Sequence, residues 1–220
     1  MKSASFVASI AIACLALAAP SIARAQSKGD DMPDFMREPV KTTRRHGFTI
    51  GLQAAPAMLW ARATPNDYAK RNDAYAVRLD HVVATTGSLF LGVAFADELS
   101  FAFQLEPSFV RHGDVRVSGF SFAFRVETFP FVSLGGIWRD LGIAPRFGLG
   151  SARFRSVSTG DSLATSGGLY SLVGVDVFLD AARLGHFGLG PTIGLAHRFS
   201  ETYRSTELTL GLRVAFYGGP

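Results

Sequence analysis

Cysteine is nearly absent from this sequence, because Cys14 is the only one among 220 residues. It lies in an apolar stretch that we expect to be removed, so the mature chain would hold no disulfide, no thiolate metal site and no cysteine nucleophile. After residue 25 there is no run of about 18 apolar residues, which excludes a transmembrane helix. Basic residues are scattered, and the formal net charge of +4 falls to +2 once Lys2 and Arg24 are removed. The charge therefore gives no reason to expect a nucleic-acid partner.

An export signal is predicted over residues 1–25. Lys2 supplies its positive start, residues 6–19 are apolar or small, and Ala23-Arg24-Ala25 forms an A-x-A cleavage site before Gln26. We therefore expect the mature chain to begin at Gln26.

Two further features belong to the N-terminal region. In the alternative that Cys14 is acylated as in a lipoprotein, the preceding residues form only a poor lipobox. Residues 26–45 are polar, carry charges of both signs and lack periodicity. They predict a disordered periplasmic tail.

The segment from Glu207 to Tyr217 is apolar at every second position. The apolar positions are Leu208, Leu210, Leu212, Val214 and Phe216. Between them lie small, polar or charged residues such as Gly211 and Arg213, so one face suits lipid and the other does not. Similar segments recur along the chain, which is typical of a transmembrane β-barrel. The strands must close into a ring, because an open sheet in lipid would leave N–H and C=O groups unpaired.

Eight such segments predict an all-β, antiparallel, up-and-down transmembrane barrel over residues 46–217, with a short tail at 218–220. The spans are residues 47–55, 88–95, 101–109, 115–127, 142–154, 169–180, 187–196 and 207–217. Polar residues predict long outer loops at 58–72 and 156–168, and short turns are expected at the end that holds both termini.

Two features complicate the count and the pairing of strands. The alternation from Ala74 to Phe95 is too long for one crossing of roughly 9–11 residues. We interpret residues 74–80 as an extension beyond the membrane, and a ten-stranded barrel is the alternative. Pro56 is expected to limit regular pairing of the first strand.

This pattern resembles the small eight-stranded outer-membrane β-barrel proteins of bacteria, the class that includes OmpX and the membrane domain of OmpA. The resemblance covers residues 46–217 and rests on the alternation, the export signal and a last strand that ends in Phe216-Tyr217. It implies a monomer in the outer membrane, with the membrane lipids and the outer-membrane assembly machinery as partners. Assembly signals of that class usually end the chain on the aromatic residue, whereas Gly218-Gly219-Pro220 follows here. Trp138, Phe216 and Tyr217 are predicted to lie at the membrane interface.

Polar residues on the face away from lipid are predicted to point into the barrel, because an outward arginine at mid-membrane costs roughly 2–4 kcal/mol. They are Gln53, Gln104, Glu106, Arg125, Glu127, Arg146, Asp176, Arg198 and Arg213. If the loop at 156–168 joins its strands symmetrically, Arg146 lies opposite Asp176, and the same counting sets Arg198 opposite Glu207. Such ion pairs would form a charged constriction in a pore or a plug in a structural barrel. The narrow interior of an eight-stranded barrel favours the plug.

Glycine is frequent on the same inward face. The positions are Gly51, Gly92, Gly148, Gly150, Gly174, Gly190, Gly194 and Gly211. They would leave room for a lipid chain or a thread of water, or they would let tightly coiled strands bend, and we favour the bending.

No catalytic, cofactor or metal site is predicted. The histidines are His46, His81, His112, His186 and His197, most of them at expected ends or turns. None lies in a serine motif of the barrel lipases, acyltransferases or lipid A deacylases. His112 is close in sequence to Ser108 and Asp114, but a water-exposed turn histidine is the favoured interpretation. Two Gly-Leu-Gly segments lack the following helix that a nucleotide-binding loop needs.

The sequence therefore predicts an outer-membrane barrel with a structural or surface-interaction role and no catalysis. A narrow pore for small solutes is the alternative, and a barrel-embedded lipid enzyme comes third. A soluble barrel of lipocalin type is the architectural alternative, with the apolar residues pointing inward around a ligand. The scarcity of charge on the expected outer face favours the membrane barrel.

Overall fold

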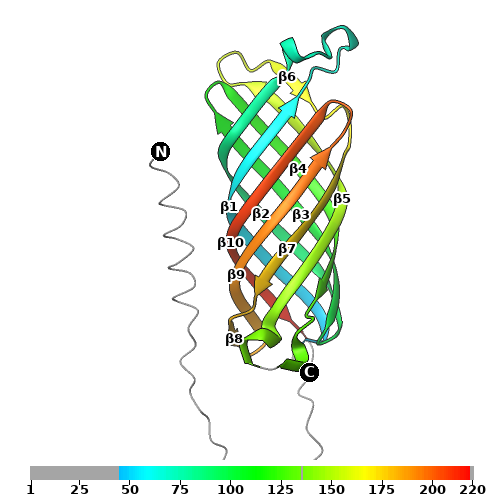
Figure 1. Cartoon of the computed structure of the whole chain (residues 1–220), viewed down its shortest axis with the longest axis vertical. Helices are drawn as coiled ribbons and strands as arrows, with labels where there is room; N and C mark the ends of the chain where they lie inside the picture. Colours follow the sequence, from blue (N-terminus) through cyan, green and yellow to red (C-terminus); the bar gives the residue numbers. More distant parts are fainter. Residues whose placement is uncertain (1–44, 135, 219–220) are drawn as a thin grey trace, which may run out of the picture.

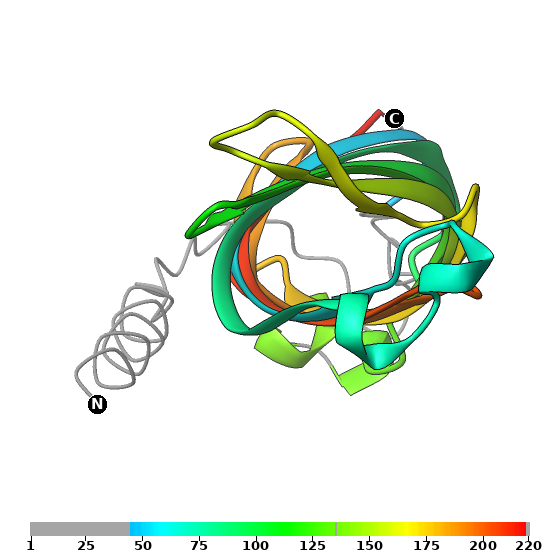
Figure 2. The same cartoon turned by 90° about the horizontal axis from the view of Figure 1, so that it is seen from above.

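Eight long antiparallel strands form a closed barrel, shown from the side in Figure 1 and down its axis in Figure 2. This computed structural model describes residues 45–134 and 136–218. The eight strands are β1 (Gly47–Ala63), β2 (Val77–Ala96), β3 (Leu99–His112), β4 (Val115–Thr128), β5 (Leu141–Ser156), β7 (Tyr170–Leu179), β9 (Phe187–Phe199) and β10 (Tyr203–Tyr217). Each pairs with the next along the chain, and β10 closes the ring on β1. The predicted all-β, eight-stranded, up-and-down barrel is confirmed.

Two further strands are short and lie on the paths of longer ones. β6 (Ser162–Thr165) pairs with β5 beyond the stretch that pairs with β7, and β8 (Ala182–Leu184) pairs with the beginning of β9. The predicted loop at 156–168 thus contains a strand. Neither short strand adds a member to the ring, and β2 is one continuous strand. The ten-stranded alternative is therefore wrong.

The first two strands are longer than predicted. β1 continues through Pro56 to Ala63, so the predicted outer loop at 58–72 begins as strand. Ala55 and Pro56 have no partner in β10, although the register is the same on either side of them, because proline has no N–H to donate. The loop between β1 and β2 holds two 3₁₀ turns, η2 (Tyr68–Lys70) and η3 (Asp73–Tyr75). Figure 1 shows this hairpin rising above its neighbours.

The alternation along each strand separates an apolar outer face from the interior. On β1, Phe48 and Leu52 are 49% and 61% exposed, whereas Thr49 and Gln53 are 1% and 9% exposed. Large apolar side chains are exposed in the same way on the other strands, for example Phe103, Phe120, Phe147, Val173, Ile193 and Leu212. The predicted orientation, with apolar residues outward, is confirmed.

Both ends of the described chain lie at one end of the barrel, which we call the turn end. The opposite end is called the loop end (Figure 1). The connection between β4 and β5 at the turn end contains η4 (Val132–Leu134) and η5 (Gly136–Asp140), while the tight turn at 113–114 lies at the loop end. The predicted contrast between short turns at one end and long loops at the other is therefore only partial. No helix in the described residues is long and apolar enough to cross a membrane.

The barrel interior has two parts. Towards the loop end, apolar side chains pack together, among them Leu59, Leu79, Val82, Val117, Phe154, Leu172 and Tyr203. Towards the turn end, the interior is charged and includes the buried rings of Phe90, Phe129 and Phe178. The predicted export signal, residues 26–44 of the predicted tail, and residues 219 and 220 lie outside the described residues.

Candidate functional site: the charged interior

All nine polar residues predicted to face inward are buried. Arg125, Glu127, Asp176 and Arg213 are 0% exposed, and the others, with Glu207, are at most 9% exposed. They come from β1, β3, β4, β5, β7, β9 and β10, and the period of two along each strand directs them to one centre. They form the candidate site of this barrel.

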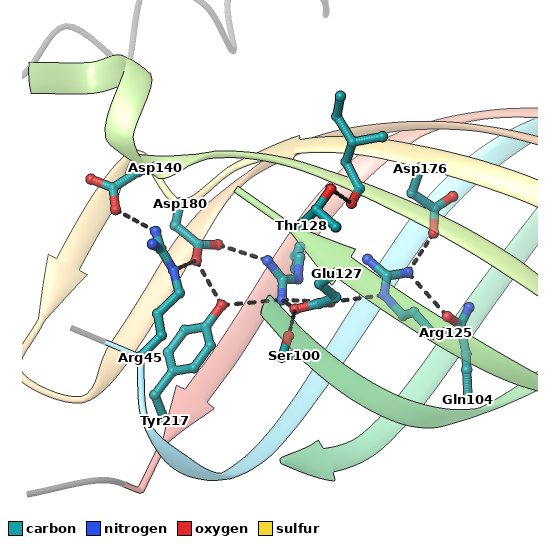
Figure 3. A network of polar contacts seen from close by, with 12 residues as sticks. Arg45, Ser100, Gln104, Arg125, Glu127, Thr128, Asp140, Asp176, Asp180 and Tyr217 are labelled. Carbon is teal, nitrogen blue, oxygen red and sulfur yellow. Dashed lines mark hydrogen bonds and ion pairs between the residues drawn. The ribbon is translucent and has the colours of Figure 1, made fainter. Parts of the chain in front are cut away.

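Arg213 on β10 joins two carboxylates at the turn end of this site, Glu127 and Asp180, which are labelled in Figure 3. Its Nη2 donates to both oxygens of Glu127, at 2.9 and 2.8 Å, and its Nη1 donates to Asp180 Oδ1 at 2.9 Å. Glu127 also accepts from Arg125 Nε at 2.8 Å and from Ser100 Oγ at 3.1 Å. Charges removed from water need partners of opposite charge, because each buried ion costs several kcal/mol to desolvate.

Arg125 connects this cluster to the middle of the barrel. Its Nη1 donates to Asp176 Oδ2 at 2.5 Å and to Gln104 Oε1 at 3.0 Å, as Figure 3 shows. On its other side, Asp176 Oδ1 lies 3.4 Å from Arg146 Nη2, and Arg146 also donates to Glu106. Asp176 therefore lies between two arginines and links both halves of the network.

The network ends at Arg198 on β9. Its Nη1 donates to Glu207 Oε2 at 2.7 Å, and its Nη2 lies 3.8 Å from Glu106 Oε2. Among the described residues, the buried charged side chains are five arginines and six carboxylates. Arg183, partly buried at the turn end, lies 3.5 Å from Asp140 and 3.7 Å from Asp180. Positive and negative charges in and beside the interior are thus balanced.

The two predicted ion pairs are brought together through a register that differs from the predicted one. Asp176 lies opposite Ala144 and not opposite Arg146, and Glu207 lies opposite Ala196 and not opposite Arg198. Each pair is instead diagonal, two positions apart. An arginine side chain reaches a diagonal neighbour at about 7–8 Å between backbones, so the contact survives the error of register.

Arg45 was predicted to belong to the disordered tail, and the structure corrects this. Its side chain is 0% exposed inside the turn end, where Nη2 donates to Asp140 Oδ1 at 2.5 Å and the guanidinium lies 3.5 Å from the centre of the Phe129 ring. Its backbone N–H donates to Asp97 Oδ1 at 2.7 Å. This position could not be predicted, because Arg45 precedes the first alternating segment and its partners Asp97, Phe129 and Asp140 lie between the long strands.

Tyr217 was predicted to be an interfacial aromatic residue, and this is wrong. It is 1% exposed, and its hydroxyl donates to Asp180 Oδ2 at 2.8 Å. The period of two explains the difference, since Phe216 and Tyr217 are consecutive and must lie on opposite faces. Phe216 does lie on the outer face, 5.1 Å from the ring of Phe187 between centres. Trp138, in η5 at the turn end, is 58% exposed.

Buried aromatic rings lie against the arginines of the site. The guanidinium carbon of Arg213 is 3.7 Å from the centre of the Phe178 ring and 5.0 Å from that of Phe90, and Arg125 is 5.2 Å from Phe90. Such cation–π contacts are worth roughly 2 kcal/mol when the cation is desolvated. The rings thus hold the arginines in place where water is excluded.

Several inward glycines make room for these and other rings. A Cβ atom at Gly51 would collide with Phe90, and one at Gly142 would collide with Phe178. Gly150 faces Tyr170 in the same way. The prediction that inward glycines serve mainly to bend the strands therefore omitted their second role, which is to let aromatic rings pack against the backbone. That role could not be predicted, because it depends on which residues of neighbouring strands lie opposite each other.

The charged interior contains a small cavity. A cavity of about 10 Å³ lies between Gln53, Ser88, Glu106, Arg146 and Thr209, among others. That is enough for about one water molecule. Buried polar atoms without a hydrogen-bond partner surround it, including Gln53 Oε1, Ser88 Oγ and Glu106 Oε2. The charged side chains of the interior are therefore held in ion pairs, such as Arg146 with Glu106 and Arg198 with Glu207, with little free space beside this cavity.

Outside the charged interior, the turn between β3 and β4 holds Asp114. Asp114, which is close in sequence to His112 and Ser108, accepts from Ser156 Oγ at 2.7 Å and from the Ser158 N–H at 2.8 Å. These two hydrogen bonds, that from Ser156 first, hold the pKa of Asp114 below its ordinary value of 3.8. No group of three His, Cys, Asp or Glu residues able to hold a metal occurs in the described chain.

No family model matches this chain, and no curated protein matches it. Solved structures do match. Neisserial surface protein A matches with a TM-score of 0.52 at 16% identity, over 76% of this chain and 96% of that chain. Ail, the attachment invasion locus protein of Yersinia pestis, matches with 0.46 at 12% identity, over 78% and 99%. The outer membrane protein OprG from Pseudomonas aeruginosa matches with 0.41 at 9% identity, over 79% and 98%. The fold is that of the small eight-stranded outer-membrane β-barrels, as the sequence resemblance implied.

Proposed function

We propose that this chain is an integral outer-membrane barrel with a closed interior and a structural or surface-interaction role, without catalysis. The outer face supports a membrane position. On β3 the outward residues from Phe101 to Phe109 are all apolar, and on β4 those from Phe120 to Val126 are too. The apolar stretch of β3 has the length of a tilted strand that crosses a bilayer, roughly 9–11 residues, and that of β4 is two residues shorter than the stretch of β3. The turn end, with both ends of the described chain, would face the periplasm.

The filled interior is the observation that carries the closed state. Near the turn end Arg125, Arg213 and Glu127 are fully buried, and near the loop end Phe154 and Leu79 pack with their apolar neighbours. An eight-stranded barrel is just wide enough for side chains to fill it. A solute would have to displace both the ion pairs and the apolar packing.

Partner expectations follow from the same features. A closed ring leaves no unpaired strand edge for a second copy, which supports a monomer. The β1–β2 hairpin projects from the loop end and exposes Tyr68 and Tyr75, which are 86% and 54% exposed. Such a hairpin offers a surface to a partner outside the cell. Membrane lipids and the barrel assembly machinery remain the expected partners within the envelope.

Cell fractionation with gels of boiled and unboiled samples tests the membrane assignment. We expect the mature protein in the outer-membrane fraction, with an unboiled band that migrates faster than the boiled one. A periplasmic protein without this shift would contradict the assignment and favour a soluble barrel with a different arrangement of its apolar face.

Conductance in planar bilayers tests the closed interior. We expect no unitary conductance from the refolded barrel at any voltage. A narrow pore is the second candidate, favoured by the unpartnered polar atoms Gln53 Oε1, Ser88 Oγ and Glu106 Oε2 around the small cavity. Steady conductance that changes with Arg146→Ala would establish that pore and refute closure. Lipid A or phospholipid profiles that change on deletion and overexpression would contradict the absence of catalysis.

A further inference from the structure

Three arginines form an uninterrupted row across three neighbouring strands near the loop end. Arg111 on β3 lies directly opposite Arg116 on β4, and Arg116 lies directly opposite Arg155 on β5. All three are exposed, and they point outward because the alternate residues, such as Val117 and Phe154, are buried. A fourth exposed arginine, Arg153, lies one outward step closer to the membrane belt.

The arrangement is electrostatically unfavourable in the protein alone. Like charges directly opposite each other in a sheet destabilise it, since side chains in such pairs begin only about 4.5–5.5 Å apart. Within the part of the chain that the structure describes, none of these four arginines has a carboxylate within 4.0 Å. The nearby carboxylate of Asp114 is bound to Ser156 and Ser158. Asp114 keeps its negative charge in these hydrogen bonds but forms no ion pair with the row, so the arginines have no contacting carboxylate among the described residues.

A second row of arginines, on β2, β1 and β10, shows how a carboxylate of this chain can neutralise such a row. Arg62 on β1 lies opposite both Arg78 on β2 and Arg204 on β10. Asp73, in the loop between β1 and β2, forms ion pairs with Arg62 and with Arg78. In the described part of the chain, no carboxylate makes the ion pairs with the row on β3 to β5 that Asp73 makes with the second row, which leaves the row open to an external anion.

The place of the unpaired row favours a lipid as the source of that anion. Towards the middle of the barrel, the outward residues of β3, β4 and β5 become apolar. Four residues along β3 from Arg111, the residues opposite each other are Pro107, Phe120 and Ser151, and two residues further they are Leu105, Phe122 and Leu149. A hollow of about 420 Å³ lies between Arg111, Arg116, Phe109 and Val157, so cationic and apolar side chains line the same space. An amphiphile with a phosphate head and acyl chains has both chemistries, and guanidinium groups bind phosphate through paired hydrogen bonds.

We propose that Arg111, Arg116 and Arg155, supported by Arg153, form a binding site for the phosphate group of a membrane lipid at the loop end of the barrel. The head group lies across the row, and the acyl chains descend over Phe109 and Phe120. This inference rests on the proposed membrane position of the barrel, and it adds a specific lipid site that the fold itself does not require.

The test is a titration of the refolded full barrel in phosphatidylcholine micelles with phosphatidic acid of the same acyl chains, followed by native mass spectrometry of retained lipid. The variant Arg111→Gln/Arg116→Gln/Arg155→Gln should raise the dissociation constant for phosphatidic acid by at least roughly tenfold, because it removes charge-assisted hydrogen bonds. The matched control, Arg62→Gln/Arg71→Gln/Arg78→Gln, removes the same formal charge from arginines that pair with Asp73 and Glu201. It should change the constant by no more than about twofold, the effect expected of screened surface charge.

Three results would overturn the proposal. Equal losses in both triple variants would mean general charge attraction. Displacement of phosphatidic acid by an equal concentration of inorganic phosphate would identify free phosphate as the ligand. Equal retention of phosphatidic acid and of phosphatidylcholine, whose phosphate is balanced by its own choline, would mean that the row does not select an anionic phosphate head group. Flotation with vesicles and the mobility shift between boiled and unboiled samples test the membrane barrel independently. A protein that passes both tests but shows no preference for phosphatidic acid would refute the lipid site and leave the proposed membrane barrel intact.

Discussion

At the scale of single residues, Arg213 is a buried cation that pairs with two buried carboxylates. It is 0% exposed and donates to Glu127 and to Asp180. We expect Arg213→Met to lower the free energy of unfolding by about 3–5 kcal/mol, because it leaves two buried carboxylates short of a partner. Urea unfolding of the barrel in vesicles, followed by the mobility of unboiled samples, measures this change.

Arg204 on the same strand supplies the control for that prediction. It is exposed on the outer face, so Arg204→Met should change the free energy of unfolding by no more than about 0.5 kcal/mol. The double variant Arg213→Met/Glu127→Gln should recover part of the loss, since it removes a charge that has lost its partner. Equal effects of the two single variants would show that the buried network does not stabilise the fold.

The orientation of single side chains could be predicted from the sequence, whereas their ion-pair partners could not be predicted correctly in register. The period of two correctly turned Arg125, Arg146 and Arg213 inward, because lipid excludes charge from one face. Partner choice needs the register, which depends on loop geometry, and here the prediction was two positions in error. Arg45 was not predicted, because nothing in a polar segment before the first strand indicates that it turns back into the barrel.

At the scale of elements, Asp114 attaches the connection after β5 to the β3–β4 turn. Its lowered pKa means that hydrogen bonds favour the ionised form, so this attachment is complete above the ordinary pKa of 3.8 and is lost as pH falls through the lower folded value. We expect amide exchange at Ser158 to accelerate in that acidic range in the native protein. In Asp114→Ala it should already be fast at neutral pH, and NMR of amide exchange measures both.

The contradictory result for Asp114 is equally defined. An exchange rate at Ser158 that, once corrected for the intrinsic pH dependence of exchange, is the same at neutral and acidic pH would show that the carboxylate does not hold the loop. Asp114→Asn is the second variant, because it keeps an acceptor but cannot ionise. It should remove the pH dependence while it slows exchange relative to Asp114→Ala.

The pairing of β1 with β2 depends on a glycine that faces an aromatic ring. In Gly51→Ala the new Cβ would collide with Phe90, which lies beside Arg125 and Arg213. We expect a loss of about 1–3 kcal/mol in the free energy of unfolding, as for other overpacked interiors. Gly87→Ala on β2 is the control, because its Cβ would have only an ordinary contact, 3.5 Å from Gln53 O. Urea unfolding of both variants measures the difference, and equal midpoints would contradict the argument.

Strand existence was easier to predict than strand ends. Lipid imposes alternation only across the membrane, so the spans were found where outward residues are apolar. Beyond the membrane the outward residues are polar, and the alternation on β1 from Trp60 to Ala63 could not be separated from a loop. β6 was missed because its four residues, Ser162–Thr165, are too few to show an alternation, and its pairing with β5 is tertiary.

At the scale of the whole molecule, the interior of the barrel holds two chemically different groups of buried side chains, one apolar and one charged, and this predicts how the protein responds to the loss of Arg45. Arg45 attaches the beginning of the described chain to the turn end through Asp97 and Asp140. Arg183 also lies near Asp140 and Asp180, so it would still balance part of the negative charge of these two carboxylates after Arg45 is replaced. Arg45→Ala should therefore lower the free energy of unfolding by only about 1–3 kcal/mol.

The same variant separates local attachment from closure of the lumen. Conductance should remain absent in Arg45→Ala, because the ion pairs of Arg125 and Arg213 and the apolar packing near the loop end still fill the barrel. His46→Ala changes the next residue, which is exposed, and should alter neither quantity. Unfolding in urea and conductance in planar bilayers are measured on the same refolded samples. If Arg45→Ala conducts while His46→Ala does not, the N-terminal segment and not the filled interior closes the barrel, and the narrow pore becomes the better account of its function.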